Sequence, residues 1–133
     1  MSSENTKALV CRYFELMKAG SPELPALLSE DVTWWAPPSS PLGGLHEGKA
    51  KVLALMGQGV ALYSGPLRVT IESLIAEGDE AAAQLVIDGR TAKGEPYHNF
   101  YHFAFRVRDG KICAVREYVD TLYAQRMLFD QRA

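Results

Sequence analysis

The sequence predicts an α+β fold in which helices come first and a run of antiparallel strands follows. Apolar residues recur at three- and four-residue steps over much of the first 62 residues, which is typical of amphipathic helices. From Leu67 onward, apolar and polar residues alternate in segments that short turn sequences separate, which is typical of strands. Elements grouped in this order favour an α+β fold over an alternating α/β one. At 133 residues the chain has the usual length of one domain, so we expect a single domain over residues 1–133.

Three helices are expected in the N-terminal half. The first runs from about Glu4 to Lys18, and Gly20 follows it at the position where glycine often ends a helix. Ser21 as cap and Pro22 as first helical residue predict a short second helix, which continues through Leu28. The third helix covers about 48–62. Its inner side is predicted to carry Val52, Leu55, Met56 and Val60.

The strands are predicted from alternation and from the turns between them. A first strand at 32–36 ends at a proline pair, and the run PPSSPLGG at 37–44 is expected to form an irregular loop. The other strands are expected at 67–76, 80–88, 96–108 and 111–120. Asp109-Gly110 is the strongest hairpin signal in the chain. A closing helix is expected at 121–130, with Asp120 as its cap.

Charge and composition argue against several classes of partner. Lysine and arginine number 14 against 16 acidic residues, and no basic cluster forms, so no nucleic-acid partner is expected. No secretion signal and no bilayer-spanning apolar stretch is visible, so we expect a cytoplasmic protein with no membrane partner. Cys11 and Cys113 lie far apart in apolar settings, which favours buried thiols over a disulfide or a zinc site.

The last predicted hairpin holds the most informative pattern. Side chains alternate between the two faces of a strand, so Asn99 and Tyr101 share the inner face with Val115, Glu117 and Val119. A carboxylate among apolar neighbours loses hydration, which raises its pKa and suits it to proton transfer near neutral pH. Glu117 is therefore the candidate catalytic residue. The alternative is a salt bridge to an arginine, or an edge position that reaches water.

A set of mostly apolar and aromatic residues is predicted to line a ligand pocket beside Glu117. These residues are Asn99, Tyr101, Trp34, Tyr13, Met17, Phe103, Val115 and Val119. Trp34 and Trp35 point to opposite sides of their strand, and we favour Trp34 for the pocket. Aromatic residues at such spacings also form ordinary core, and Asn99 can equally satisfy a loop backbone.

The three histidines do not form a metal site by spacing. His98 and His102 share the outer face of one strand, but four residues of strand separate them by roughly 14 Å. No metal is therefore expected. That outer face is more simply explained as a homodimer surface, and His46 is expected to pin a loop or to be solvated. No nucleophile, phosphate-binding or zinc-protease motif is present in the sequence.

The C-terminal segment GEPYHNFYHFAFRVRDGKICAVREYVDT, residues 94–121, resembles SnoaL-like proteins of the nuclear transport factor 2 and ketosteroid isomerase superfamily. The order of predicted elements fits that superfamily over almost the whole chain. The resemblance implies an α+β cone in which a strongly curved antiparallel sheet and three N-terminal-half helices enclose an apolar pocket, with a short C-terminal helix. Most members are dimers without a metal or organic cofactor, so neither a metal nor an organic cofactor is expected here.

The functional residues of the characterised relatives have only some counterparts in this sequence. In the cyclases of this superfamily, an Asp shortly after the DGK turn acts as acid and base, and Glu117 stands at that position. The histidine that accompanies it falls near Phe103, and His102 is expected to face the other side. The epoxide hydrolases' second Asp and Arg map near Val86 and Gln84, so epoxide hydrolysis by that mechanism is not expected.

The sequence therefore predicts a pocket protein for a small hydrophobic carbonyl or polyketide-like metabolite. As a cofactor-independent isomerase, cyclase or lyase, it would use Glu117 to move a proton beside a carbonyl, while Asn99 and Tyr101 hold the oxygen. The alternative is a non-catalytic ligand-binding or accessory dimeric protein.

Overall fold

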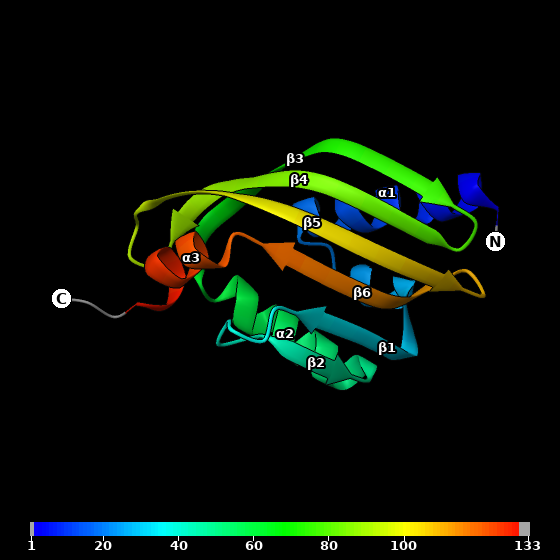
Figure 1. The fold of residues 1–133 in the computed structure, drawn as a ribbon, viewed down its shortest axis with the longest axis horizontal. Coiled ribbons are helices and arrows are strands. Elements are labelled where there is room, and N and C mark those ends of the chain that lie inside the picture. Colours follow the sequence, from blue (N-terminus) through cyan, green and yellow to red (C-terminus); the bar gives the residue numbers. More distant parts are fainter. Residues whose placement is uncertain (1, 131–133) are drawn as a thin grey trace.

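A curved sheet of six strands forms the centre of the fold, with α1 behind it and the C-terminal helix at one end (Figure 1). The computed structural model describes residues 2–130. The first half contains α1 (Ser3–Ala19), the 3₁₀ helix η1 (Leu24–Leu27), β1 (Leu28–Ala36), β2 (Gly44–Glu47) and α2 (Lys49–Val60). The second half contains β3 (Tyr63–Glu77), β4 (Glu80–Thr91), β5 (Pro96–Arg108), β6 (Lys111–Val119), α3 (Thr121–Ala124) and the π-helical turn η2 (Gln125–Phe129).

The sheet is larger than the sequence predicts, and it is mixed. Its strand order is β2-β1-β6-β5-β4-β3, and β1 runs parallel to β6 whereas the other neighbours are antiparallel. The four-residue β2 lies in a stretch that starts with a loop-like Gly-Gly pair, so no periodic signal marks it. The pairing of β1 with β6 joins segments about 80 residues apart, which local alternation does not reveal.

The helices follow the predicted order with shifted boundaries. The cap of α1 is confirmed, since Gly20 adopts φ 61° and its N–H bonds back to the carbonyls of the last turn. The second helix is shorter than predicted and begins at Leu24, because the Ser21 hydroxyl accepts the N–H of Glu23 in a local turn. Val60, predicted to face inward, is 70% exposed at the last residue of α2. Asp120 caps α3 as predicted, accepting the N–H of Tyr123.

We call the face of the sheet that packs on α1 the inner face. Tyr13 and Phe14 of α1 make edge-on ring contacts with Phe105, and Phe14 also packs on Phe103. Each such buried aromatic ring contributes about 1.5–3 kcal/mol through the water it excludes. The α1 helix therefore fills one part of the inner face and leaves another part, toward α2 and α3, for a cavity.

The predicted assignment of side chains to the two faces of the last hairpin is confirmed. Asn99 and Tyr101 are buried, whereas His98, His102 and Arg116 are exposed. One irregularity was not predicted, because Val107 pairs with Ile112 and Arg106 with Ala114, which leaves Cys113 as the extra residue of a bulge. The Cys113 thiol is buried and donates to the carbonyl of Arg106. No helix among residues 2–130 is long and apolar enough to cross a membrane.

Candidate functional site

A cavity of about 150 Å³ lies between the inner face of the sheet and the segments that close one end of it. In Figure 1 this is the end of the sheet at which α3 lies, on the left. The sheet contributes Trp34, Ala36, Tyr63, Tyr101, Glu117 and Val119 to the lining. The surrounding segments contribute Ser40, Leu42, Leu55, Met56, Gly59, Leu62, Ala124, Leu128 and Phe129.

Glu117 is held in this cavity by one hydrogen bond. The parallel pairing of β1 with β6 sets Trp34 opposite Val115. Val115 is the residue of β6 that precedes Glu117 on the inner face of the sheet. From there the indole Nε1 of Trp34 donates to Oε1 of Glu117 over 3.0 Å. The other carboxyl oxygen, Oε2, has no hydrogen-bond partner among residues 2–130 and is free to meet a ligand.

The surroundings of Glu117 disfavour its charged form. The carboxyl can be reached from the cavity, but protein atoms surround it and displace bulk water. Burial therefore raises the pKa of Glu117, and the hydrogen bond from Trp34 opposes part of that rise. None of the described lining residues is a lysine, arginine or histidine, so no side-chain cation offsets the charge. A carboxyl whose pKa is raised in this way holds a proton more readily than an exposed glutamate does, which suits it to exchange a proton with a bound ligand.

Tyrosine hydroxyls supply the polar groups of the same cavity. The hydroxyl of Tyr101 lies 2.7 Å from that of Tyr97 and 3.3 Å from that of Tyr63. Burial raises the pKa of both Tyr63 and Tyr101 above that of an exposed tyrosine, so both remain protonated donors. The cavity thus combines one carboxyl group with two neutral tyrosine hydroxyl groups.

Four of the predicted site residues line the cavity, and five do not. The four are Glu117, Tyr101, Trp34 and Val119. Tyr13, Phe103 and Val115 belong to the buried core, and Met17 packs against that core. Asn99 is 1% exposed and lies behind the tyrosines, where its amide bonds to Tyr97. Contact of these five residues with a ligand remains a prediction, and their positions outside the lining do not favour it.

Sequence reasoning missed Tyr63 and the segments that close the cavity. The alternation that marks β3 becomes regular only from Leu67, because a register shift separates the pairs of Ser64 and Arg68. Tyr63 therefore stood outside the predicted strand. Leu55 and Met56, in contrast, were predicted on the inner side of the third helix and do line the cavity.

Comparison with known proteins identifies the family. The sequence profile of the SnoaL-like domain matches residues 10–115. The chain belongs to the SnoaL-like family. No protein of curated function matches the sequence.

Solved structures with the same fold cover nearly the whole SnoaL-like chain. A nuclear-transport-factor-2-like protein from Burkholderia xenovorans LB400 is 27% identical, with 96% of this chain and 98% of that one covered and a TM-score of 0.79. A candidate SnoaL-like polyketide cyclase from Jannaschia sp. CCS1 is 15% identical, with coverages of 98% and 95% and a TM-score of 0.83. A candidate isomerase from Bacillus subtilis is 20% identical, with coverages of 93% and 92% and a TM-score of 0.80. The last two similarities establish the fold alone.

The loop that closes the SnoaL-like cavity is tied at several points. His46 on β2 bonds through Nε2 to the carbonyl of Leu42 over 3.0 Å, which is the loop-pinning role considered for this histidine. Within the loop, the N–H of Ser40 donates to the carbonyl of Pro37, and the N–H of Gly43 to that of Ser40. These bonds hold Ser40 and Leu42 at the cavity wall.

The other two histidines lie outside the cavity, on the outer face of the sheet. The Nδ1 atom of His98 bonds to the carboxylate of Asp88, whereas His102 is exposed. No group of three or more metal-binding side chains occurs among the residues that the structure describes. Neither histidine therefore shares a site with Glu117.

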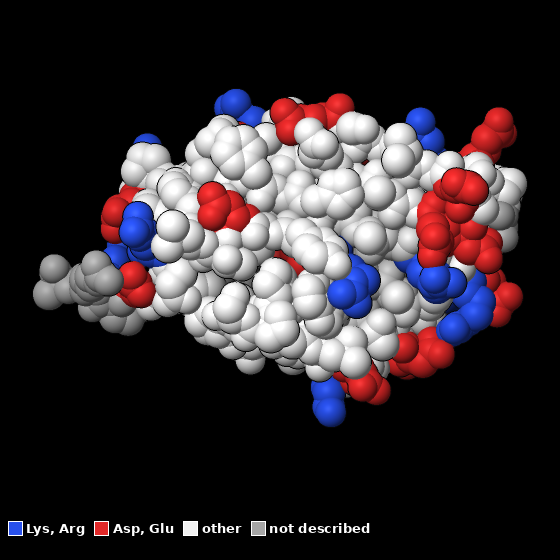
Figure 2. Space-filling view, in the orientation of Figure 1, with Lys and Arg blue, Asp and Glu red and all other residues white. Residues whose placement is uncertain are grey.

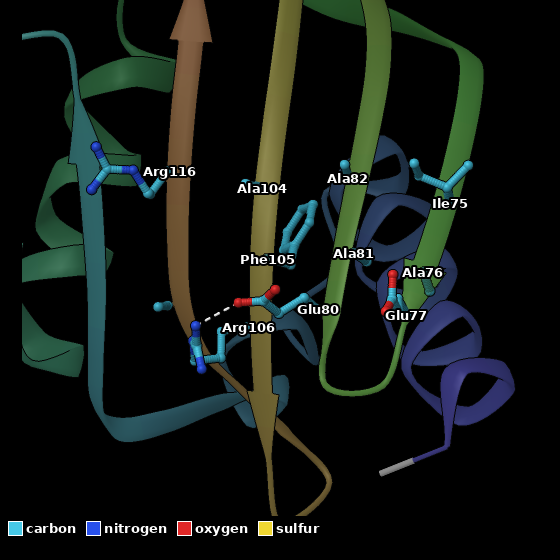
Figure 3. A pocket seen from close by; sticks show the side chains of 11 residues that line it. Ile75, Ala76, Glu77, Glu80, Ala81, Ala82, Ala104, Phe105, Arg106 and Arg116 are labelled. Atoms are coloured by element: carbon cyan, nitrogen blue, oxygen red, sulfur yellow. Dashed lines mark hydrogen bonds and ion pairs between the residues drawn. The ribbon is translucent and has the colours of Figure 1, made fainter.

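A second hollow, of about 400 Å³, lies on the outer face and has a different character. Its floor consists of Ala82, Ala104 and Ala114 on three neighbouring strands. Figure 3 shows Ile75 and Arg116 on opposite sides of it and the ion pair of Glu80 with Arg106 below. The Arg116 guanidinium stacks on Trp35, 4.1 Å from the ring centre. The floor is thus apolar. Four charged residues surround it, of which Glu80 and Arg106 pair with each other and Arg116 stacks on an aromatic ring.

Proposed function

We propose that this SnoaL-like protein is a cofactor-independent acid/base enzyme that moves a proton beside the carbonyl group of a small neutral metabolite. One observation carries the proposal. Glu117 places a desolvated carboxyl, with Oε2 unbonded among the described residues, in the same cavity as the hydroxyls of Tyr63 and Tyr101. A base and oxygen-binding donors in one water-poor cavity are the groups that enolisation requires.

The proposed step conserves atoms and charge. The Glu117 carboxylate takes a proton from the carbon next to the carbonyl, and the C–H electron pair moves to form the enolate. The hydroxyls of Tyr101 and Tyr63 donate hydrogen bonds to the enolate oxygen as its charge grows. Protonated Glu117 then returns the proton to the same carbon or to another carbon of the conjugated system. Because one group both takes and returns the proton, a single carboxyl is sufficient for an isomerisation.

The dimensions and charge of the cavity narrow the substrate class. A cavity of about 150 Å³ is the size that holds one benzene-like ring. A multi-ring polyketide exceeds this volume, so a single-ring or short-chain carbonyl compound is the better match. An anionic substrate would meet Glu117 with no cation among the described lining residues. We therefore favour a neutral ligand over an acid.

The structural relatives support this class of reaction without identifying the substrate. The candidate isomerase from Bacillus subtilis and the candidate cyclase from Jannaschia share the fold over more than nine tenths of each chain. One is named an isomerase and the other a polyketide cyclase. An isomerase or cyclase activity is accordingly the most economical assignment for the Glu117 cavity.

Hydrogen exchange at a ketone tests the proposal without knowledge of the natural substrate. The protein is incubated with cyclohexanone in D₂O, and deuterium entering the α positions is followed by NMR. We expect exchange faster than in buffer with the same ionic composition. Binding without accelerated exchange would contradict the enzyme assignment and support the alternative, a ligand-binding protein.

We further propose a homodimer through the outer face of the sheet. Figure 2 shows this face with a broad uncharged region across its middle and most charges toward its ends. Phe100 is 56% exposed, Tyr118 43% and Ile75 66%, and all three lie on that face. Apolar patches of this kind usually mark association sites. A second copy fits the hollow above the alanine floor, because an apolar side chain there displaces water from apolar surface.

Replacement of Phe100 tests this interface. Sedimentation of the unmodified protein at micromolar concentration should give twice the monomer mass of 14.7 kDa. Phe100→Asp should shift the population to monomer, because it buries a charge in the apolar contact. Val60→Asp, at a 70% exposed position on α2, is the matched control and should leave the dimer intact. An unmodified protein that sediments only at 14.7 kDa would contradict the proposal.

A further inference from the structure

We infer that Arg116 of each copy docks in the outer-face hollow of a second copy and pairs there with Glu77 of the partner subunit. Trp35, on which Arg116 stacks, enters the hollow together with it. This inference rests on the proposed homodimer and goes beyond it, because it assigns the contacts that join the two sheets and the orientation of one copy relative to the other.

Five outward-facing side chains form one row across neighbouring strands of the sheet. Trp35 of β1 pairs with Arg116 of β6, which pairs with Ala104 of β5. Ala104 pairs with Ala82 of β4, which pairs with Ile75 of β3. Figure 3 shows the resulting shape, with Arg116 and Ile75 on the two sides and the alanines between them. A ridge of large side chains thus stands beside a hollow of similar length.

The two rims of this hollow carry unpaired charges of opposite sign. On one rim, the Arg116 guanidinium stacks on Trp35 and forms no ion pair within residues 2–130. On the other rim, Glu77 stands opposite Glu80 in the hairpin of β3 and β4. Arg106 pairs with Glu80, so Glu77 is left without a cation among the described residues. One rim therefore has an excess positive charge and the other an excess negative charge.

Arg116 and Glu77 are too far apart to pair within one chain. They lie on β6 and β3, and β5 and β4 run between these strands. Three strand spacings amount to roughly 14 Å. The stacking on Trp35 also draws the guanidinium toward β1, away from Glu77. A carboxylate partner for Arg116 on this face has to come from another molecule, and a second copy carries one at the matching rim.

A twofold axis along β5 brings the ridge of one copy into the hollow of the other. The strands β6 and β4 flank β5, and β1 and β3 lie one strand further out on each side. When two sheets face each other about this axis, β6 covers β4 of the partner subunit and β1 covers its β3. Arg116 then lies over Ala82 of the partner subunit. Ala104 lies at the axis, where its small side chain lets the sheets approach closely.

Glu77 of the partner subunit lies close to this position of Arg116. It follows Ile75 by two residues on the same face of β3, which is roughly 7 Å along the strand and within the reach of an arginine side chain. A guanidinium that stacks on an aromatic ring keeps its N–H donors free at its edge for a carboxylate. Because the axis is twofold, the pair of Arg116 with Glu77 forms twice in each dimer.

The pairing explains how a face with these charges can be buried. The Trp35 ring and the methylene stem of Arg116 cover the alanine floor and remove apolar surface from water. An arginine buried in such a contact without an acidic partner would lose its hydration and gain nothing in return. Glu77 supplies that partner, so the charges on the two rims determine which surface can bind here.

Reversal of the two charges on separate chains tests the pairing. Arg116→Glu opposes two carboxylates, and Glu77→Arg opposes two guanidinium groups. Each variant alone should dissociate about a hundredfold or more readily than the unmodified dimer, and should sediment as a monomer at micromolar concentration. An equimolar mixture of the two variants should form a mixed dimer of twice 14.7 kDa, because both of its pairs then join opposite charges.

Charge reversals behind the sheet are the matched controls. Glu15→Arg and Lys18→Glu make the same changes in net charge at exposed positions of α1, which packs on the inner face. Both should remain dimers. Thermal unfolding of every variant shows whether the fold is retained, so that loss of the dimer is distinguished from loss of the fold.

The outcomes separate this inference from the earlier proposals. A dimeric Arg116→Glu protein, or a mixture of the two variants that stays monomeric, would overturn the pairing and leave a homodimer of another geometry. An unmodified protein that is monomeric would overturn both the pairing and the homodimer. Neither Arg116 nor Glu77 lines the Glu117 cavity, so absence of deuterium exchange would remove the catalytic role without affecting the pairing.

Discussion

Glu117→Gln is expected to slow deuterium exchange at the α-carbon of cyclohexanone by about a hundredfold or more, the usual effect of removing a general base. Glutamine keeps the shape of the side chain, and its amide oxygen can still accept the N–H of Trp34. It has no basic oxygen that takes a proton at neutral pH. Ligand affinity should therefore be largely kept while exchange is lost, and both are measured by NMR on the same samples.

The pH dependence of exchange identifies the group responsible. Only the carboxylate form of Glu117 acts as a base, so the rate should rise with pH as this group loses its proton. Because burial raises the pKa of Glu117, the midpoint of that rise should lie above the roughly 4.3 of a free glutamate. Glu23→Gln, at an exposed glutamate that pairs with Arg12, is the control and should keep the rate. Undiminished exchange in Glu117→Gln would remove the catalytic role.

Gly43→Ala is expected to disrupt the loop that closes the cavity. An added Cβ at Gly43 would lie 1.9 Å from the carbonyl oxygen of Pro37, and main-chain atoms cannot rotate away as a side chain can. We expect a loss of about 2 kcal/mol or more of stability, which corresponds to roughly 6–10 °C in the thermal midpoint. If the loop moves instead, cyclohexanone affinity should fall, because Ser40 and Leu42 leave the cavity wall.

Gly57→Ala provides the matched comparison for this loop variant. Gly57 lies in α2, and an added Cβ meets no other atom within 4 Å. Alanine in a helix interior should stabilise the protein by about 0.5–1 kcal/mol. A Gly43→Ala protein with unchanged thermal midpoint and unchanged ligand affinity would show that the loop does not close the cavity as described.

Much of this fold follows from local sequence patterns, because the strands and helices carry clear periodicities. The alternation of side chains along a strand, with a period of two residues, is enough to place Glu117 and Tyr101 on the inner face and His102 on the outer one. The same rule separates Trp34, which bonds to Glu117, from Trp35, which stacks with Arg116 outside. Alternation is reliable here because one face of each strand must be buried.

The parts of the site that the sequence did not predict depend on contacts between distant segments. The parallel pair of β1 and β6 brings Trp34 to Glu117 across 83 positions of sequence, and no local pattern encodes that pairing. The C-terminal residues Leu128 and Phe129 reach the cavity only through the docking of the last helical turn. The position of Asn99 behind the tyrosines depends on the bonds of its amide to the main chain of Phe100 and Asp120.

Titration of the Glu117 side-chain carboxyl by ¹³C NMR tests the central claim most directly, because it needs no substrate. Glu117→Gln identifies the resonance by its disappearance. Burial of the carboxyl beside Trp34, with no cation among the described lining residues, predicts a midpoint above the roughly 4.3 of a free glutamate. The midpoint should move further when cyclohexanone fills the cavity and displaces water. A midpoint at or below the free value, unchanged by the ligand, would show that Glu117 is solvated or ion-paired and is not the base of this site.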